Sequence, residues 1–134
     1  MVASRPMDAQ QALADLTEIS SQIRASALAT TGGQVLAAQG GDGKTLARAA
    51  RDLLAAAEEV RPEGALSQIE AATAAGSLFV VRDGDRIVAA TTGPEPTVGL
   101  VFYDLKSTLR AAEPEEKPKR RRTRKKAEDG DEAA

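Results

Sequence analysis

The sequence of 134 residues contains no cysteine, no histidine and no tryptophan. Without cysteine it can form neither a disulfide nor a thiolate metal site, and without histidine it has no imidazole for metal binding or general-base catalysis. Catalytic groups of the Ser–His–Asp or Cys–His type are therefore excluded. Carboxylates and lysines remain as the only candidates for acid–base chemistry.

Long hydrophobic stretches and aromatic side chains are also scarce. The apolar runs, such as residues 78–81, are far shorter than the roughly 20 residues that a membrane-spanning helix needs, and the first ten residues include no apolar signal segment. We therefore expect a cytoplasmic protein. With two Phe and one Tyr, the core must be built mainly from Ala, Leu and Val, which disfavours a deep pocket for a cofactor or small-molecule substrate.

The composition changes at Glu113. Residues 113–134 lack large apolar side chains and mix basic with acidic residues, whereas the preceding chain has regular hydrophobic patterns. Such a segment cannot bury enough surface to offset the entropy of ordering. We therefore expect one folded domain at residues 8–112 and a disordered tail at 113–134. The basic residues of the tail are Lys117, Lys119, Arg120, Arg121, Arg122, Arg124, Lys125 and Lys126.

The basic tail could contact nucleic acid, an anionic surface or an acidic patch on a partner, or it could act only as a solubilising segment. No aromatic residue is interleaved for base stacking, and acidic blocks flank the basic cluster on both sides. This pattern favours weak, salt-dependent polyanion binding over specific recognition of a nucleic acid.

Three segments show the spacing of amphipathic helices. The first begins after Asp8, a good N-cap, with Gln11 completing a capping-box-like pair. The third follows Thr97 as N-cap and ends near Ala112. The second ends at residues 61–62, because the residue before proline resists helical backbone angles. Its predicted core stripe comprises Leu46, Ala49, Ala50, Leu53, Leu54, Ala57 and Val60.

Five segments read as strands, at residues 23–30, 34–38, 65–73, 77–82 and 86–92. Gly32 and Gly33 allow a tight turn between the first two, and Asp83-Gly84 predicts a hairpin between the last two. The remaining carboxylates, Asp85, Glu95 and Asp104 together with Asp83, could be imagined as a catalytic set. Turns and loops already explain them, so we expect no enzyme activity.

A phosphate-loop pattern occurs at residues 38–45, AQGGDGKT, between a strand and a helix. In such a loop Lys44 would contact phosphate oxygens and Thr45 would bind Mg²⁺. We expect instead a polar loop that starts a helix. Too little chain follows to build a parallel sheet, and no later strand ends in the acidic residue that would hold Mg²⁺.

The order helix, two strands, helix, three strands, helix resembles the roadblock/dynein light-chain family, in particular its small-GTPase regulators, which include bacterial members. The resemblance covers residues 8–112 and is carried by three stretches: TTGGQVLAA at the first turn, GSLFVVRDGDRIVAATT at the central hairpin, and TVGLVFYDLKSTL at the last helix. The first turn departs from the family pattern, since Gly32 stands where family members carry Asp.

The resemblance implies an α/β (α+β) fold of the roadblock/profilin-like type. This is a three-layer α-β-α sandwich around a five-stranded antiparallel sheet, and two copies pair through the second helix and third strand. The implied function is a non-enzymatic homodimeric scaffold or regulatory module that binds a small Ras-like GTPase. The Ala-rich second helix allows close helix approach, so Ala47, Ala55, Ala56 and Arg51 are the predicted dimer contacts. The alternative is a DNA- or polyanion-associated protein that acts through its tail.

Overall fold

The computed structural model describes residues 8–61 and 67–112. Its elements are α1 (Ala9–Ile19), β1 (Ile23–Thr30), β2 (Val35–Gln39), α2 (Gly43–Val60), β3 (Gln68–Thr73), β4 (Gly76–Asp83), β5 (Arg86–Thr92) and α3 (Val98–Ala111). The predicted order of helices and strands is confirmed. The basic tail lies outside the described residues, as do the first two residues of the strand predicted at 65–73.

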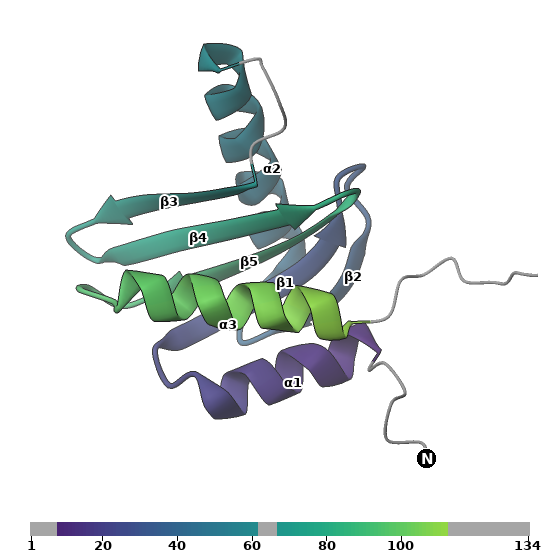
Figure 1. Cartoon of the computed structure of the whole chain (residues 1–134), viewed down its shortest axis with the longest axis vertical. Coiled ribbons are helices and arrows are strands. Elements are labelled where there is room, and N and C mark those ends of the chain that lie inside the picture. The colour runs from purple at the N-terminus through teal and green to yellow at the C-terminus, as the bar shows by residue number, and fades with distance from the viewer. Residues whose placement is uncertain (1–7, 62–66, 113–134) are drawn as a thin grey trace, which may run out of the picture.

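All five strands form one antiparallel sheet in the order β2-β1-β5-β4-β3 (Figure 1). The first strand of the chain therefore pairs with the last, and β2 and β3 lie at the two edges. The predicted hairpin turn is present between β4 and β5. Gly84 there has a φ of 66°, a left-handed backbone angle that glycine adopts at little cost.

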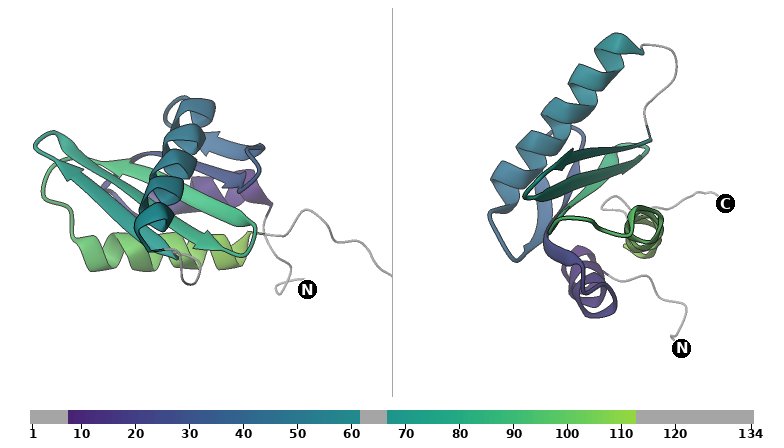
Figure 2. Two further views of the ribbon diagram at one scale, coloured as in Figure 1. Left: turned by 90° about the horizontal axis from the view of Figure 1, so that it is seen from above. Right: turned by 90° about the vertical axis from the view of Figure 1, so that its left-hand side faces the viewer.

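The sheet lies between two helical layers, with α1 and α3 on one face and α2 on the other (Figure 2). Alternation along β4 serves both layers, since Phe79 and Val81 point to the α1–α3 core and Val80 points to α2. Phe102 of α3 meets Phe79 edge-to-face at a ring-centroid distance of 5.0 Å. The predicted three-layer α-β-α sandwich is thus confirmed.

Side-chain hydrogen bonds fix the ends of the helices. The Asp8 carboxylate accepts the backbone N–H of Gln11 at 2.8 Å, which satisfies a free donor in the first turn of α1. At the C-terminal end of α3, the carbonyls of Leu109 and Ala112 accept hydrogen bonds from the guanidinium of Arg86 at 3.0 and 3.1 Å. These two bonds occupy carbonyls that the last turn of α3 leaves free and tie that turn to the sheet.

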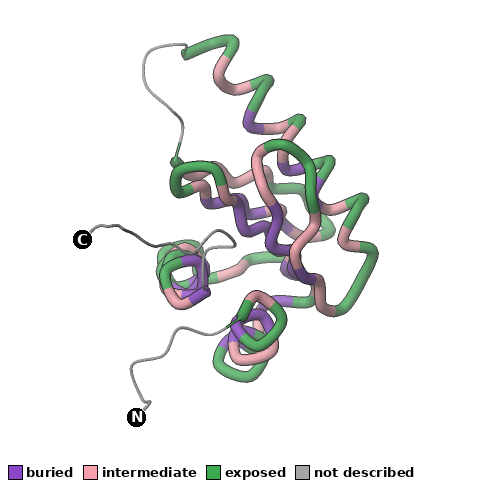
Figure 3. Tube along the Cα trace, turned by 90° about the vertical axis from the view of Figure 1, so that its right-hand side faces the viewer, coloured by how far each residue is buried: buried purple, intermediate pink, exposed green. Residues whose placement is uncertain are grey.

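The core stripe predicted for α2 is too wide. Only Ala47, Ala50 and Leu54 are buried along this helix, and Figure 3 shows that most of α2 is exposed or half-buried. Ala49 is exposed and Val60 is 77% exposed, so placing these two in the core was wrong. The helix lies across the sheet along a narrow line, and its C-terminal part extends past the strands (Figure 2).

Candidate interaction surface

An apolar stripe runs along the flank of α2 beside its buried line. Its members follow each other at alternating steps of three and four residues, which is the spacing of a helix–helix contact seam. We call these residues the α2 seam: Leu46, Ala49, Leu53, Ala56 and Val60. Leu46 and Leu53 are half-buried and the other three are exposed. The sequence pattern identified these positions as apolar, but four of the five were assigned to the core.

The α2 seam adjoins the β3 side of the sheet. Leu46 and Leu53 pack against the same small core as Ile69 of β3 and Leu78 of β4, and all four are only half-buried. Within the described residues β3 pairs with β4 alone, so the outer backbone groups of β3 have no strand neighbour. Exposed apolar surface next to an open strand edge is typical of a surface that takes another chain.

The opposite edge of the sheet differs. There α1 lies alongside β2, and the Gln10 side chain donates a hydrogen bond from Nε2 to the carbonyl of Ala38 at 3.2 Å. A side chain from α1 thus occupies a backbone acceptor on β2 and obstructs the addition of another strand. The two edges are therefore unequal, and β3 is the one suited to pairing.

The residues predicted to form a dimer contact do not share one face of α2. Ala56 lies in the α2 seam, whereas Ala55 is turned from it by about 100° and lies on the opposite, polar flank. Ala47 is 3% exposed and packs between α2 and the sheet. Arg51 donates from Nε to the carbonyl of Thr31 at 3.1 Å and so belongs to the polar flank as well.

The polar flank of α2 borders a shallow cavity of about 250 Å³ near the turns at one end of the sheet. Arg82 of β4 forms an ion pair there with Glu58 of α2, and both side chains are part-buried. Arg51 and Asp52 also line this cavity. Its two cations and two carboxylates balance, so the cavity has no net charge with which to select a charged ligand.

The stretch that matches the phosphate-loop pattern has a different geometry. The Asp42 carboxylate accepts the backbone N–H of Lys44 at 3.1 Å and the hydroxyl of Thr45 at 2.8 Å. The hydrogen bond from Thr45 is the main cause that lowers the pKa of Asp42 below its ordinary value of 3.8. A carboxylate therefore occupies the helix N-terminus where a phosphate would sit, and its charge would repel one.

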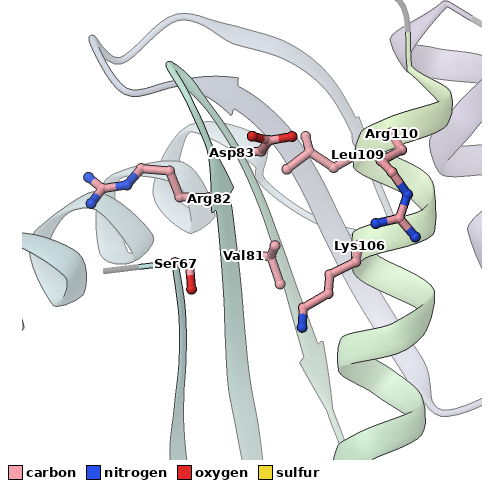
Figure 4. A pocket seen from close by; sticks show the side chains of 7 residues that line it. All are labelled: Ser67, Val81, Arg82, Asp83, Lys106, Leu109 and Arg110. Atoms are coloured by element: carbon pink, nitrogen blue, oxygen red, sulfur yellow. The ribbon is translucent and has the colours of Figure 1, made fainter. Parts of the chain in front are cut away.

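A second, smaller cavity of about 170 Å³ lies between α3 and the β3–β4 hairpin (Figure 4). Lys106 and Arg110 of α3 border it over an apolar floor that includes Val81 and Leu109. Arg82 reaches away from these two cations, toward α2 (Figure 4).

In the part of the chain that the structure describes, no group of three acidic side chains is placed to hold a metal ion. None of the described helices combines the length and apolar character needed to cross a membrane.

Strand order, helix layers and element order together define the fold of Roadblock/LC7 domains. A Roadblock/LC7 domain from Streptomyces avermitilis superposes with a TM-score of 0.69 at 18% identity, covering 77% of this chain and 92% of that chain. The gliding protein MglB from Thermus thermophilus gives 0.65 at 17% identity, covering 75% and 82%. A structure described as MglB with tetrameric arrangement gives 0.61 at 18% identity, covering 73% and 82%. No protein-family model and no curated protein matches the sequence.

Proposed function

We propose that this protein is a non-enzymatic, cytoplasmic homodimer that serves as a regulatory platform for a partner protein, a small Ras-like GTPase. The observation that carries the proposal is the α2 seam beside the open β3 edge. It is a half-exposed apolar surface that a lone copy leaves in water, on a fold shared with Roadblock/LC7 domains.

In the proposed dimer the two α2 seams pack against each other across a two-fold axis. The small side chains of Ala49 and Ala56 let the helix backbones approach closely, while Leu53 and Val60 fill the space between them. The β3 strands then meet edge to edge and join the two sheets into one. Pairing would satisfy the free backbone groups of β3 and cover Ile69 and Leu78 at the same time.

The GTPase assignment has less direct support than the dimer. It comes from the three sequence stretches that resemble the roadblock/dynein light-chain family. This chain shares its fold with the gliding protein MglB, and one solved MglB structure has a tetrameric arrangement. The shared fold is therefore compatible with self-association. The cavities described above are small, which favours a binding role over catalysis.

Two measurements on the full chain test the two halves of the proposal. Sedimentation equilibrium across a range of protein concentrations should give a dimer, and amide hydrogen exchange in β3 should slow as the dimer forms. A protein that stays monomeric at high micromolar concentration, with β3 amides that exchange freely, would exclude the dimer.

A Ras-like GTPase loaded with GDP or with a non-hydrolysable GTP analogue is then titrated onto the dimer by calorimetry. Nucleotide-dependent binding supports the platform role. Binding of duplex DNA in low salt, with no binding of the GTPase in either nucleotide state, would favour the alternative function through the basic tail.

A further inference from the structure

A second apolar surface lies on the opposite side of the sheet from the α2 seam. Five large apolar side chains are exposed among the described residues, and four of them lie in the last turn of α1 and the first turns of α3. These are Ile19 (65% exposed), Val98 (39%), Leu100 (49%) and Tyr103 (65%). The two helix ends are tied together, because the backbone N–H of Thr97 donates to Oε1 of Gln22 at 2.6 Å. The dimer proposed above leaves this surface uncovered.

Helix periodicity places Ile19 and Leu100 on facing flanks of the two helices. On α1, Gln10 reaches β2, and Ile19 lies nine residues on, about half a turn round the helix and thus toward α3. On α3, Phe102 packs on β4, and Leu100 and Asp104 lie on the opposite flank, toward α1. Because α1 and α3 run antiparallel (Figure 1), this periodicity predicts that Ile19 faces Leu100.

The same alignment predicts that Asp15 of α1 faces Asp104, one turn further along the surface between these two helices, which we call the α1–α3 surface. Asp15 accepts a hydrogen bond from the Gln11 side chain at 2.9 Å. Asp104 is only 7% exposed, and within residues 8–61 and 67–112 its carboxylate has neither a hydrogen bond nor an ion pair. The carboxylate oxygens are not among the fully buried polar atoms, so they keep some contact with solvent and are free to receive a cation.

α1 contributes no cation to the α1–α3 surface, and Arg24 of β1 lies beyond its apolar end, beside residues 93–96. Residues 8–23 contain no lysine or arginine. The two cations of α3, Lys106 and Arg110, border the cavity between α3 and the β3–β4 hairpin (Figure 4). The α1–α3 surface therefore combines an apolar end with an acidic middle, about 6 Å apart along α3 for a four-residue step.

We propose that the α1–α3 surface is the docking surface for the partner protein, and that it takes a helical segment carrying an apolar side chain with Lys or Arg one turn away. The apolar side chain would cover Ile19, Leu100 and Tyr103, and the cation would pair with Asp104. This inference rests on the proposed platform function and adds where the partner binds. Charge complementarity selects the occupant, because an acidic or uncharged segment would leave Asp104 unpaired.

Tyr103 makes the proposal directly measurable. It is the only tyrosine in a chain without tryptophan, so tyrosine fluorescence reports on this surface alone. The probe is a helical peptide of Leu and Lys with Leu on one face, compared with a scrambled peptide of the same composition. The ordered peptide should change the Tyr103 emission saturably. Asp104→Asn and Leu100→Ser should each weaken this binding about tenfold.

Val60→Ser is the matched control, because it removes an exposed apolar side chain from the α2 seam on the other face of the sheet. It should leave peptide binding unchanged, and Asp104→Asn and Leu100→Ser should leave the dimer seen in sedimentation unchanged. Equal binding of the scrambled peptide, or undiminished binding by both Asp104→Asn and Leu100→Ser, would overturn the proposal. So would peptide binding that appears only after the eight tail cations are changed to Gln, since the tail would then be the occupant. A dimer that persists in these cases leaves the platform function standing.

Discussion

A pair of neighbouring substitutions distinguishes the α2 seam from the rest of the helix. Ala55 and Ala56 are both exposed, both lie in the part of α2 beyond its last buried residue, and differ in direction by about 100°. We expect Ala56→Glu to disrupt the dimer and Ala55→Glu to leave it nearly intact. The same chemical change one residue apart thus serves as its own control.

The magnitude follows from the two-fold symmetry of the proposed contact. Each Ala56→Glu substitution enters the interface twice, and it places carboxylates against an apolar seam with no cation among Leu46, Ala49, Leu53 and Val60 to pair them. Unpaired or like charges at an interface cost several kcal/mol. Taking about 3 kcal/mol, the dimer dissociation constant should rise roughly a hundredfold. The isolated fold should change by less than about 0.5 kcal/mol, because both sites are exposed and Glu is a good helix former.

Sedimentation equilibrium of the wild type and both variants gives the dissociation constants, and urea unfolding at a concentration where all three are monomeric gives their stabilities. The reasoning is refuted if the two variants dissociate equally, or if Ala55→Glu is the weaker dimer. A weaker dimer in Ala55→Glu would instead place Ala55, one of the dimer contacts predicted from the sequence, in the interface.

Three further predictions test the fold. Gly40→Ala should lower the free energy of unfolding in urea far more than Gly84→Ala. Both glycines have a positive φ, which costs alanine about 1–2 kcal/mol. At Gly40, however, the added Cβ would lie 2.3 Å from a carbonyl oxygen of β1, whereas at Gly84 it would contact nothing. Arg86→Gln should cost about 1–3 kcal/mol in thermal unfolding, because two bonds to the end of α3 are lost. Because the pKa of Asp42 is lowered in the folded state, its ionised carboxylate stabilises the fold at pH values above its ordinary pKa of 3.8. This stabilisation is lost as the pH falls through the lowered pKa. Asp42→Asn should therefore make the free energy of unfolding less dependent on pH in this acidic range.

The strands were the most predictable part of the chain. The bounds predicted for β1 and β5 match the structure, and β4 extends one residue beyond its prediction at each end. The Asp83-Gly84 turn fixes how β4 and β5 pair, and burial on both faces explains the continuous apolar runs in these central strands. The pairing of β1 with β5 was not predicted, because no local signal encodes a contact between distant segments.

The interaction surface was harder to predict, and α2 shows why. Hydrophobic spacing identifies which positions are apolar, but it does not say whether a neighbour in the same chain or another chain covers them. Val60 and Ala49 fit the helical pattern as well as Leu54 does, yet only Leu54 is buried. Alanine adds to the ambiguity, because it is favoured in any helix and indicates neither a core nor an interface.

The alanine content that obscures the prediction also explains the surface. Where α2 meets the sheet, the contact is made largely by Ala47 and Ala50 of the helix and by Ala29 and Ala89 of the strands. Small side chains on both sides allow close approach but bury little area, at roughly 25 cal/mol for each Å². Apart from the buried Leu54, the bulkier apolar residues of α2 lie on its flank, half outside this contact, so covering that flank would add stabilisation that the lone chain lacks. If the α2 seam is the dimer contact, amides of α2 should exchange faster in the Ala56→Glu variant than in wild type at a concentration where wild type is dimeric, and Ala55→Glu should match wild type.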